Sequence, residues 1–320
     1  MKENDSFVLE EISPWVVYQS KDWKRIKESS GKKPVTIEVE NKGEINAQIL
    51  AFEQILQTPF GKKQILFAEG LPLFKEEEDL KKVLNLFKKA SKKYFYGVIF
   101  PTVLSDKNTF FEEEGYSKIS NYTILLDLEK PESELFKNLE KKSSRWGVKF
   151  AEKQGLSFEE ATEEELPLFY EMYLKTTEDG GFNPESYEFF KQLFTSKIGK
   201  IFIVKKEKKL LAGGAVLLDK DYAILNLTSS TEEGHKFQAM PFFYWNIIRY
   251  TKSLNKKYLD FGGYDAEAKE GDKTFAVNKF KERFGGKIVE QPIYSTNKKY
   301  FLIRKLMRKA RFIKKLYKKQ

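Results

Sequence analysis

Apolar and polar residues follow two different periods along the first part of the chain, which predicts a fold that mixes strands with helices. Short apolar runs bounded by turn residues predict strands, and apolar residues at three- and four-residue steps predict helices. Three strands are expected at 35–39, 47–55 and 64–69, followed by a helix at 76–92 and a strand at 94–100. A helix that ends near residue 114 and a strand at 122–128 complete the order. Asn41-Lys42-Gly43 forms the expected turn between the first two strands.

The second part of the chain repeats this order. Three strands are predicted at 201–206, 212–218 and 222–227, followed by a helix at 241–254 and a strand at 258–261. A helix that ends at Phe284 and a strand at 288–294 complete the order. Pro131 opens a long basic helix, Ser133–Gln154, which would connect the two parts. A meander followed by helix, strand, helix and strand is the order of the GNAT acyltransferase fold. We therefore expect an α/β protein with two tandem GNAT-like domains, each built on a mixed sheet.

Two segments look like copies of each other. Each has Lys-Lys-Tyr at the start of a strand, at Tyr94 and Tyr258, followed by F-x-E-x-x-G at the end of a helix. The final glycine stands where a helix C-terminus needs a left-handed residue. The difference that matters for chemistry is at the second position of this motif, where the first copy has Phe111 and the second has Lys281. A duplication that keeps its chemistry in one half would show this pattern.

The expected domains are residues 1–130, a substrate-binding unit, and residues 131–296, which hold the catalytic cleft. Residues 297–320 form a third segment. From Lys298 to the end there are 11 basic residues and no acidic one, while the net charge of the whole chain is +10. Apolar residues in this segment recur at helical steps, which predicts a basic amphipathic helix packed on the first domain. It would either attract phosphates of RNA or an anionic membrane, or be a docked helix with a solvated face.

Composition narrows the class of protein. The 28 Phe and 16 Tyr residues require burial, so we expect well-packed globular domains. The absence of Cys excludes disulfides, thiolate nucleophiles and Cys-ligated metals. The N-terminus is acidic and has no apolar core, and no run reaches the length of a transmembrane helix. We expect a soluble cytoplasmic protein.

Familiar catalytic sets are missing. A single histidine, His235, excludes a Ser-His-Asp arrangement and a histidine-based metal site, and it stands in a polar turn. Enzymes of this fold that use acyl-CoA hold its pyrophosphate on a glycine-rich loop at a helix N-terminus. Here that region, Ser229–Met240, has one glycine and two acidic residues. The sequence therefore argues against acyl-CoA as the donor, and an acyl-CoA-dependent N-acyltransferase is the alternative enzyme.

One glycine-rich strand end remains as a candidate cleft. Asp260-Phe261-Gly262-Gly263-Tyr264 lets a substrate approach the backbone, and Phe280-Lys281 follows on the next helix. A lysine that projects into this cleft could stabilise the oxyanion of an acyl-transfer intermediate. On spacing alone, the reading of Lys281 as a solvated helix lysine is the stronger one. A non-catalytic protein that binds anionic surfaces through its basic tail also fits these observations.

Lys256–Gly286 resembles the closing signature of the Fem family (FemA, FemB, FemX). The family's Q-S-x-x-W-x-x-x-K motif is similar to Gln19–Lys27, and Lys137–Gly155 is similar to its basic helix at the start of the second domain. Family members have a tandem GNAT fold and move an amino acid from aminoacyl-tRNA to a peptidoglycan stem peptide. The chain resembles the shorter FemX-type layout, because it has no heptad segment for a coiled-coil arm.

The resemblance implies an aminoacyltransferase in peptidoglycan and cell-wall biosynthesis, with aminoacyl-tRNA as co-substrate and neither cofactor nor metal. Lys281 matches the lysine that stabilises the transferred acyl group. The acceptor would be a UDP- or lipid-linked muropeptide, and the protein a monomer that touches the inner membrane face. The implied substrate-binding residues are Lys27, Arg145, Asp260, Gly262, Gly263, Tyr264 and Phe280. Lys27 and Arg145 would contact phosphates, and Asp260 would orient the attacking amine. The alternative for Lys27 is an exposed helix lysine, and the alternative for Arg145 is an arginine that faces solvent. Asp260 could instead only close its strand.

One departure from the family pattern concerns the acceptor. Many members have an arginine in a T-x-x-R-x-G-F stretch, whereas this chain has acidic residues at Glu178 and Asp179. An acidic side chain repels a phosphate, so the acceptor does not follow from the resemblance.

Deleting Lys298–Gln320 tests the role assigned to the tail. We expect weaker binding to tRNA, to anionic vesicles, or to both, because a basic residue near an anionic membrane contributes about 1 kcal/mol. Affinities for each partner, measured at one ionic strength with and without the tail, check this. If deletion changes neither affinity and unfolds the protein, the segment is a structural brace.

Overall fold

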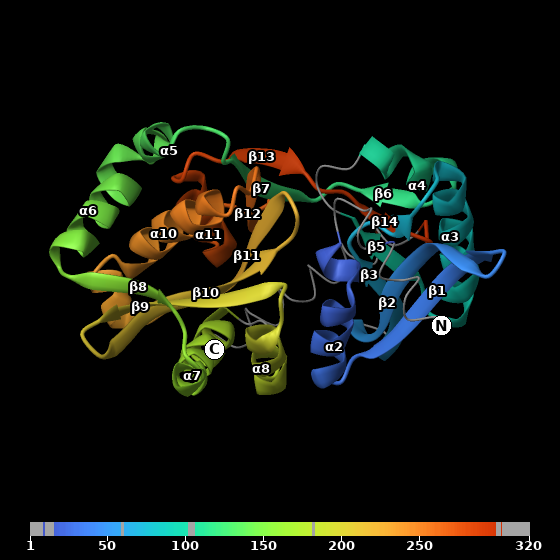
Figure 1. The fold of residues 1–320 in the computed structure, drawn as a ribbon, viewed down its shortest axis with the longest axis horizontal. Helices are drawn as coiled ribbons and strands as arrows, with labels where there is room; N and C mark the ends of the chain where they lie inside the picture. The colour runs from blue at the N-terminus through green and yellow to red at the C-terminus, as the bar shows by residue number, and fades with distance from the viewer. Residues whose placement is uncertain are drawn as a thin grey trace. The chain divides into compact units, whose positions relative to one another are not determined.

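A computed structural model describes residues 16–58, 61–101, 106–180 and 183–298, together with Leu9 and Leu302. The chain divides into two compact units, with breaks after Ser120 and after Glu290 (Figure 1). Residues 121–290 form the second unit, and the first unit is built from both ends of the chain. The expected boundaries near residues 130 and 296 differ from this division because two strands pair differently from the prediction. The predicted C-terminal basic helix lies outside the described residues.

The first unit is a mixed sheet with helices on it. In spatial order the strands are β1 (Lys33–Asn41), β2 (Glu44–Thr58), β3 (Gly61–Glu69), β5 (Gly97–Phe100), β14 (Ile293–Ser295) and β6 (Ser117–Ile119), with β4 (Leu73–Phe74) also paired to β2. The described helices are α2 (Lys21–Ser29), α3 (Glu77–Ala90) and α4 (Thr109–Glu113), with 3₁₀ turns η1 (Val17–Gln19), η2 (Ser91–Lys93) and η3 (Asp106–Asn108).

Alternation along β1 decides which helix covers which face of this sheet. Val35, Ile37 and Val39 pack into the core that α3 completes with Leu80, Val83, Leu84 and Phe87. Thr36 and Glu38 point to the opposite face, where they line a groove with residues of α2. Successive side chains of a strand point to opposite faces, so a polar–apolar alternation places α2 and α3 on different sides.

The second unit is a seven-stranded mixed sheet with helices on both faces. Its strand order is β13 (Lys287–Glu290), β7 (Tyr122–Asp127), β12 (Tyr258–Tyr264), β11 (Tyr222–Ser230), β10 (Lys209–Leu218), β9 (Gly199–Lys206) and β8 (Leu156–Glu160). The helical elements are α5 (Glu132–Asn138), the π-helical turn η4 (Lys141–Arg145), α6 (Trp146–Lys153), the 3₁₀ turn η5 (Glu163–Glu165), α7 (Leu166–Gly180), α8 (Tyr187–Thr195), α9 (Glu232–Lys236), α10 (Ala239–Ser253) and α11 (Lys273–Glu282).

Two neighbouring glycines of β10 show how the faces of this sheet are covered. A side chain on Gly213 would meet Phe169 of α7, and a side chain on Gly214 would meet Phe243 of α10. The two helices therefore lie on opposite faces of the strand (Figure 1). The sequence pattern did not predict β8, α7 or α8, although it predicted the three strands that follow them.

The tandem α/β architecture is confirmed. Both copies of F-x-E-x-x-G end a helix, α4 in the first unit and α11 in the second. Gly115 and Gly285 follow these helices with φ of 75° and 81°, the left-handed conformation expected of a C-terminal glycine.

Two strands lie in a different sheet from the one that the sequence pattern predicts. The strand Tyr122–Leu128 was predicted to complete the first unit, and this is wrong, because β7 pairs with β12 and β13 in the second sheet. The single strand predicted over 288–294 is also wrong. It divides into β13 in the second sheet and β14, which pairs with β5 and β6 in the first. Pro292 lies between the two pieces and has no N–H to donate to a ladder, so the strand ends there.

The long helix predicted over Ser133–Gln154 is wrong as well. It is broken between α5 and η4, where Leu139 and Glu140 have extended backbones with ψ of 141° and 122°. The Arg145 guanidinium donates to the carbonyl oxygens of Lys137 and Leu139, which would otherwise lack partners at the end of α5. A side-chain contact across the break therefore stabilises two short helices in place of one.

Phe111 gives a test of packing in the first unit. Its ring is fully buried and stacks on Tyr294 with centroids 4.4 Å apart. We expect Phe111→Ala to lower the free energy of unfolding by about 3–5 kcal/mol, and Phe111→Leu by less than about 1.5 kcal/mol. Equilibrium denaturation measures both, with exposed Phe95→Ala as the control. A loss no larger than that of the control would contradict the packing described here.

Candidate active site

The candidate site lies where β11 and β12 part. These parallel strands pair at only three positions, Tyr222–Tyr258, Ala223–Leu259 and Ile224–Asp260, although both continue further. Beyond this point β11 has Leu227 in a left-handed conformation with φ of 53°. The ladder of β12 with β7 is irregular between Asp260 and Gly263. Backbone groups that leave a ladder need other partners, which makes such a divergence a natural place for a polar ligand.

Lys281 supplies a cationic group at this divergence. It stands on α11, and its Nζ donates to the carbonyl oxygens of Gly262 and Gly263, each at 3.0 Å. An ammonium has three N–H donors, so one is left without a partner among the described residues. Burial lowers the pKa of Lys281 to about 8, and the negative charge of Asp260 opposes this shift. The amine is therefore fixed in position, is mostly the ammonium at neutral pH, and loses its charge as the pH rises through about 8.

Asp260 holds the bulge that presents these carbonyls. Its side chain is buried and accepts hydrogen bonds from Thr123 of β7, from Tyr222 of β11 at 3.2 Å, and from the Gly262 N–H at 2.7 Å. Burial raises the pKa of the Asp260 carboxyl, while these hydrogen bonds and the charge of Lys281 lower it. Gly262 has φ of 76°, which the bulge requires and which other residues rarely adopt.

Phe280 and Phe284, on either side of Lys281 in the sequence, belong to an aromatic cluster with Tyr244. Tyr244 of α10 packs edge-on against Phe280 at 5.1 Å and tilted against Phe284 at 4.8 Å. Burial raises the pKa of Tyr244 to about 12, so its hydroxyl stays protonated at neutral pH. Phe280 is half-buried, and its contacts place it in the wall of the site. Tyr264 is half-buried too, and its hydroxyl donates to Glu282 at 3.1 Å. Burial is the main cause of the lowered pKa of the neighbouring Lys281.

The sequence missed two partners of the site. Thr123 and Tyr222 are both buried, and each hydrogen-bonds the Asp260 carboxylate. A threonine inside the apolar run 122–128 was a visible signal, because a buried hydroxyl needs a partner. The partner itself is more than a hundred residues away, so only the pairing of β7 with β12 identifies it.

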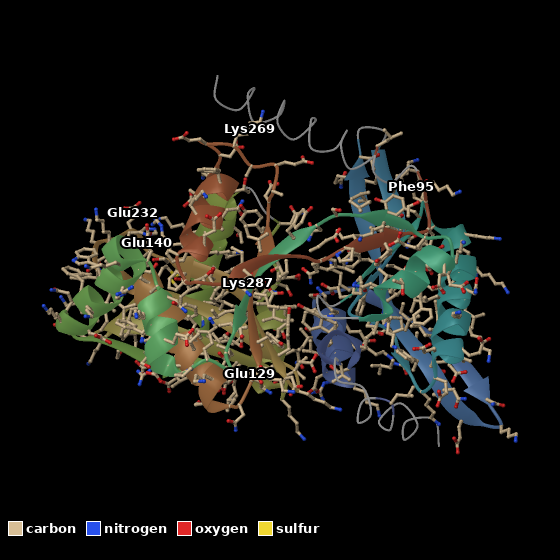
Figure 2. The ribbon with its side chains drawn as sticks, turned by 90° about the horizontal axis from the view of Figure 1, so that it is seen from above. Phe95, Glu129, Glu140, Glu232, Lys269 and Lys287 are labelled. Carbon is tan, nitrogen blue, oxygen red and sulfur yellow. The ribbon has the colours of Figure 1, made fainter. Side chains whose placement is uncertain are left out.

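Among the described residues, Arg145 shares no hydrogen bond or ion pair with Lys281 or Asp260. As part of η4 its guanidinium is bonded to backbone carbonyls at the end of α5, and its buried Nε has no partner among the described residues. Glu140, at the start of this turn, is labelled in Figure 2. The assignment of Arg145 to a substrate phosphate stays a prediction.

Lys27 belongs to the first unit and is buried, so the alternative of an exposed helix lysine is wrong. Its Nζ lies 3.6 Å from the Glu69 carboxylate and 4.8 Å from the centroid of the Trp23 ring. Trp23 Nε1 donates to the same carboxylate at 3.2 Å. The Gln19 amide bonds Leu50 and the Glu69 carbonyl. The motif Gln19–Lys27 therefore fixes α2 on the sheet, and a phosphate contact by Lys27 stays a prediction.

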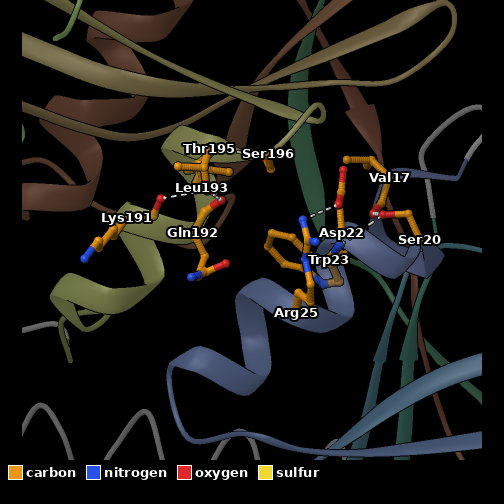
Figure 3. A network of polar contacts seen from close by, with 10 residues as sticks. All are labelled: Val17, Ser20, Asp22, Trp23, Arg25, Lys191, Gln192, Leu193, Thr195 and Ser196. Atoms are coloured by element: carbon orange, nitrogen blue, oxygen red, sulfur yellow. Dashed lines mark hydrogen bonds and ion pairs between the residues drawn. The ribbon is translucent and has the colours of Figure 1, made fainter. Parts of the chain in front are cut away.

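A groove of about 570 Å³ lies between α2 and the sheet of the first unit. Its lining carries both charges: the basic residues are Lys21, Lys24 and Arg25, and the acidic residues are Asp22, Glu28 and Glu38. Arg25 pairs with Asp22 at 2.9 Å, and the Ser20 side chain donates to the Val17 carbonyl at the start of the helix (Figure 3).

The region that would hold a pyrophosphate is closed by its own side chains. Thr231 caps α9 by accepting from the Gly234 N–H at 2.9 Å, and two acidic residues fill the first turn. A side chain on Gly234 would overlap the Leu211 carbonyl, so this glycine serves packing on β10. His235 is exposed on the same short helix.

The described residues offer neither a metal site nor a membrane-spanning helix. They contain no cluster of three or more His, Asp or Glu side chains arranged to hold a metal ion. In the same part of the chain no helix is long and apolar enough to cross a membrane.

Comparison with known proteins gives a family model and a fold. The model of the FemAB family matches residues 110–204. No curated protein matches the sequence. The crystal structure of FemX is similar over 95% of this chain and 97% of its own, with a TM-score of 0.72 and 17% identity.

Two further structures have the same architecture. The C-terminal domain of a putative lysylphosphatidylglycerol synthetase from Agrobacterium fabrum covers 93% of both chains, with a TM-score of 0.60 and 13% identity. A tandem GNAT protein from the clavulanic acid biosynthesis pathway covers 82% of both, with a TM-score of 0.50 and 12% identity. The chain therefore has the tandem GNAT fold of FemX along nearly its whole length and matches the FemAB family in residues 110–204.

Proposed function

We propose that this protein transfers an amino acid from aminoacyl-tRNA to an amine of a peptidoglycan precursor. The observation that carries the proposal is the Lys281 ammonium, held on two backbone carbonyls with one N–H left over, where β11 and β12 part. The FemAB match and the FemX fold support the reaction class. The filled N-terminus of α9 disfavours the alternative of an acyl-CoA donor.

The reaction needs no energy source besides the ester. The neutral acceptor amine attacks the ester carbonyl carbon, a C–N bond forms, and negative charge develops on the carbonyl oxygen. The remaining N–H of Lys281 stabilises this oxyanion. The intermediate then collapses, the C–O bond breaks, and the proton of the attacking amine goes to the departing ribose oxygen, which becomes a hydroxyl. An amide and uncharged tRNA result.

Asp260 acts in this scheme as a positioning residue. Its carboxylate fixes the Gly262 N–H and thereby the two carbonyls on which Lys281 rests. The aromatic wall around Tyr244 keeps the surroundings apolar, which strengthens the lysine–oxyanion interaction. Orientation of amine and ester supplies much of the remaining rate enhancement.

The first unit offers a place for the acceptor. We assign the muropeptide to the groove beside α2, because side chains of both charges suit a peptide with carboxylates and an amine. Cytoplasmic placement, with peripheral contact at the inner membrane face, belongs to the same proposal. Charged tRNA is cytoplasmic, and a lipid-linked precursor is presented on that face.

Lys281→Ala is the direct test. We expect the variant to fold and to lose about 10²–10³ in kcat, because one oxyanion donor is removed. Charged tRNA and peptidoglycan precursors are incubated with the protein, and mass spectrometry of the precursor measures transfer. The matched control is Lys279→Ala, two residues away on the same helix, where an exposed lysine pairs with Glu282. Turnover near that of the control by a folded Lys281→Ala protein would refute the assignment.

The pKa of Lys281, about 8, predicts the pH dependence of transfer. Below this value the amine is the ammonium that stabilises the oxyanion, and above it the charge is lost. We therefore expect kcat to fall as pH rises through about 8, and Lys281→Arg to lack this decline because its guanidinium stays charged. Rates measured from pH 6 to 9.5 check this. Parallel pH profiles for the two proteins would show that the lysine charge is not used.

A further inference from the structure

Helix α6 displays an aromatic pair on the outside of the second unit. Trp146 is 51% exposed, whereas Trp23 and Trp245 are 2% and 4% exposed. Its ring stacks on Phe150 with centroids 5.1 Å apart and an interplanar angle of 22°. An exposed indole supported from one side by a second ring is a preformed stacking surface.

Lysines flank this pair on the same face. Lys149 and Lys153 follow Trp146 at three- and four-residue steps, and Lys142 precedes it by one turn. All three are exposed, and none has an acidic partner within the part of the chain that the structure describes. Elsewhere in this unit the exposed lysines Lys257 and Lys279 are paired. The face of α6 therefore carries positive charge that the protein itself does not neutralise.

The buried side of α6 fixes the direction of this face. Val148 and Ala151 are in the core of the unit, and Gly147 packs against Pro241 at the start of α10 so closely that a side chain would be 3.0 Å away. With these residues inward, Trp146 and the lysines must face outward.

Contacts connect the start of this segment to the candidate active site. The Glu140 N–H donates to the Arg283 carbonyl at 2.9 Å, and the Glu140 carboxylate pairs with Arg283 Nε at 3.2 Å. Arg283 follows Lys281 by two residues at the end of α11. The basic and aromatic face therefore begins beside the end of the helix that carries Lys281.

We propose that the face of Lys142, Trp146, Lys149 and Lys153 binds the single-stranded 3′ end of the donor tRNA. The inference rests on the proposed function, because the amino acid of the donor is esterified to that end. One base stacks on Trp146, and the lysines contact the phosphates on either side of it. This combination of rings and cations tolerates any base sequence.

An anionic membrane is the competing partner, and the packing of α6 favours RNA. A helix that lies in a membrane surface needs a broad apolar face, whereas the aliphatic residues Val148 and Ala151 of α6 are buried in the unit. Trp146 and half-buried Phe150 are too small a surface for insertion, but they match the size of a base.

Fluorescence anisotropy with a short single-stranded RNA ending in CCA tests the proposal on the full chain. We expect Trp146→Ala to weaken binding on the order of tenfold through loss of one stacked base. Lys142→Gln/Lys153→Gln should reduce the slope of log K against log salt by about 1.4, the value for two phosphate contacts on a single strand. The matched control is Lys92→Gln/Lys93→Gln, which removes the same charge from exposed lysines of the first unit.

Three outcomes of the RNA-binding measurements would overturn the proposal. The first is that the unaltered protein does not bind the RNA, and the second is that Trp146→Ala leaves the affinity for RNA unchanged. The third is that Lys92→Gln/Lys93→Gln reduces the salt slope as much as Lys142→Gln/Lys153→Gln does. Vesicles containing phosphatidylglycerol form a parallel arm, and loss of vesicle binding alone would make the face a membrane contact. The KM for aminoacyl-tRNA separates a failure of the RNA-binding inference from a failure of the proposed transfer function. An unchanged KM in Trp146→Ala overturns this inference while transfer stands, and absence of transfer by the unaltered protein refutes the function itself.

Discussion

The buried carboxylate of Asp260 is the constraint on which the candidate site depends. It is bonded to Thr123 of β7, to Tyr222 of β11 and to the N–H of Gly262 in its own strand. One side chain thus joins three strands at the point where β11 and β12 separate. A buried carboxylate is costly unless it is hydrogen-bonded, so these contacts fix the bulge firmly. The Lys281 amine rests on the carbonyls that the bulge exposes.

The two copies of the repeat show the same framework with and without this opening. In the first unit, β3 and β5 pair to the end of β3, and the Gly70 N–H adds one more bond to Phe100. Phe111 stands where the second copy has Lys281, and its ring is buried against Tyr294. One copy is therefore closed and filled with apolar side chains, and the other is open with a cation. This difference supports the proposal that the reaction takes place in the second unit.

The tested parts of the sequence interpretation follow a physical pattern. Elements set by local periodicity and capping were predicted well, among them β1 to β3, α3, α10 and the left-handed Gly115 and Gly285. Lys281, Asp260, Gly262 and Gly263 were predicted from one segment, and they do lie together, because a strand and the helix after it pack closely. Thr123 and Tyr222 were not predicted, since their contact with Asp260 joins distant parts of the chain.

By itself, the sequence determined the tandem α/β order, the presence of a lysine in only one copy, and the concentration of basic charge near the C-terminus, because periodicity, repeats and charge are written in neighbouring residues. Only the tertiary structure decided which sheet takes β7 and β14, since strand pairing depends on partners far away in sequence. It also decided that Lys27 is buried beside Glu69 and that Arg145 bonds the end of α5. A lysine or an arginine reads the same in a sequence whether it meets solvent, a carboxylate or a carbonyl, and only its folded neighbours distinguish the three.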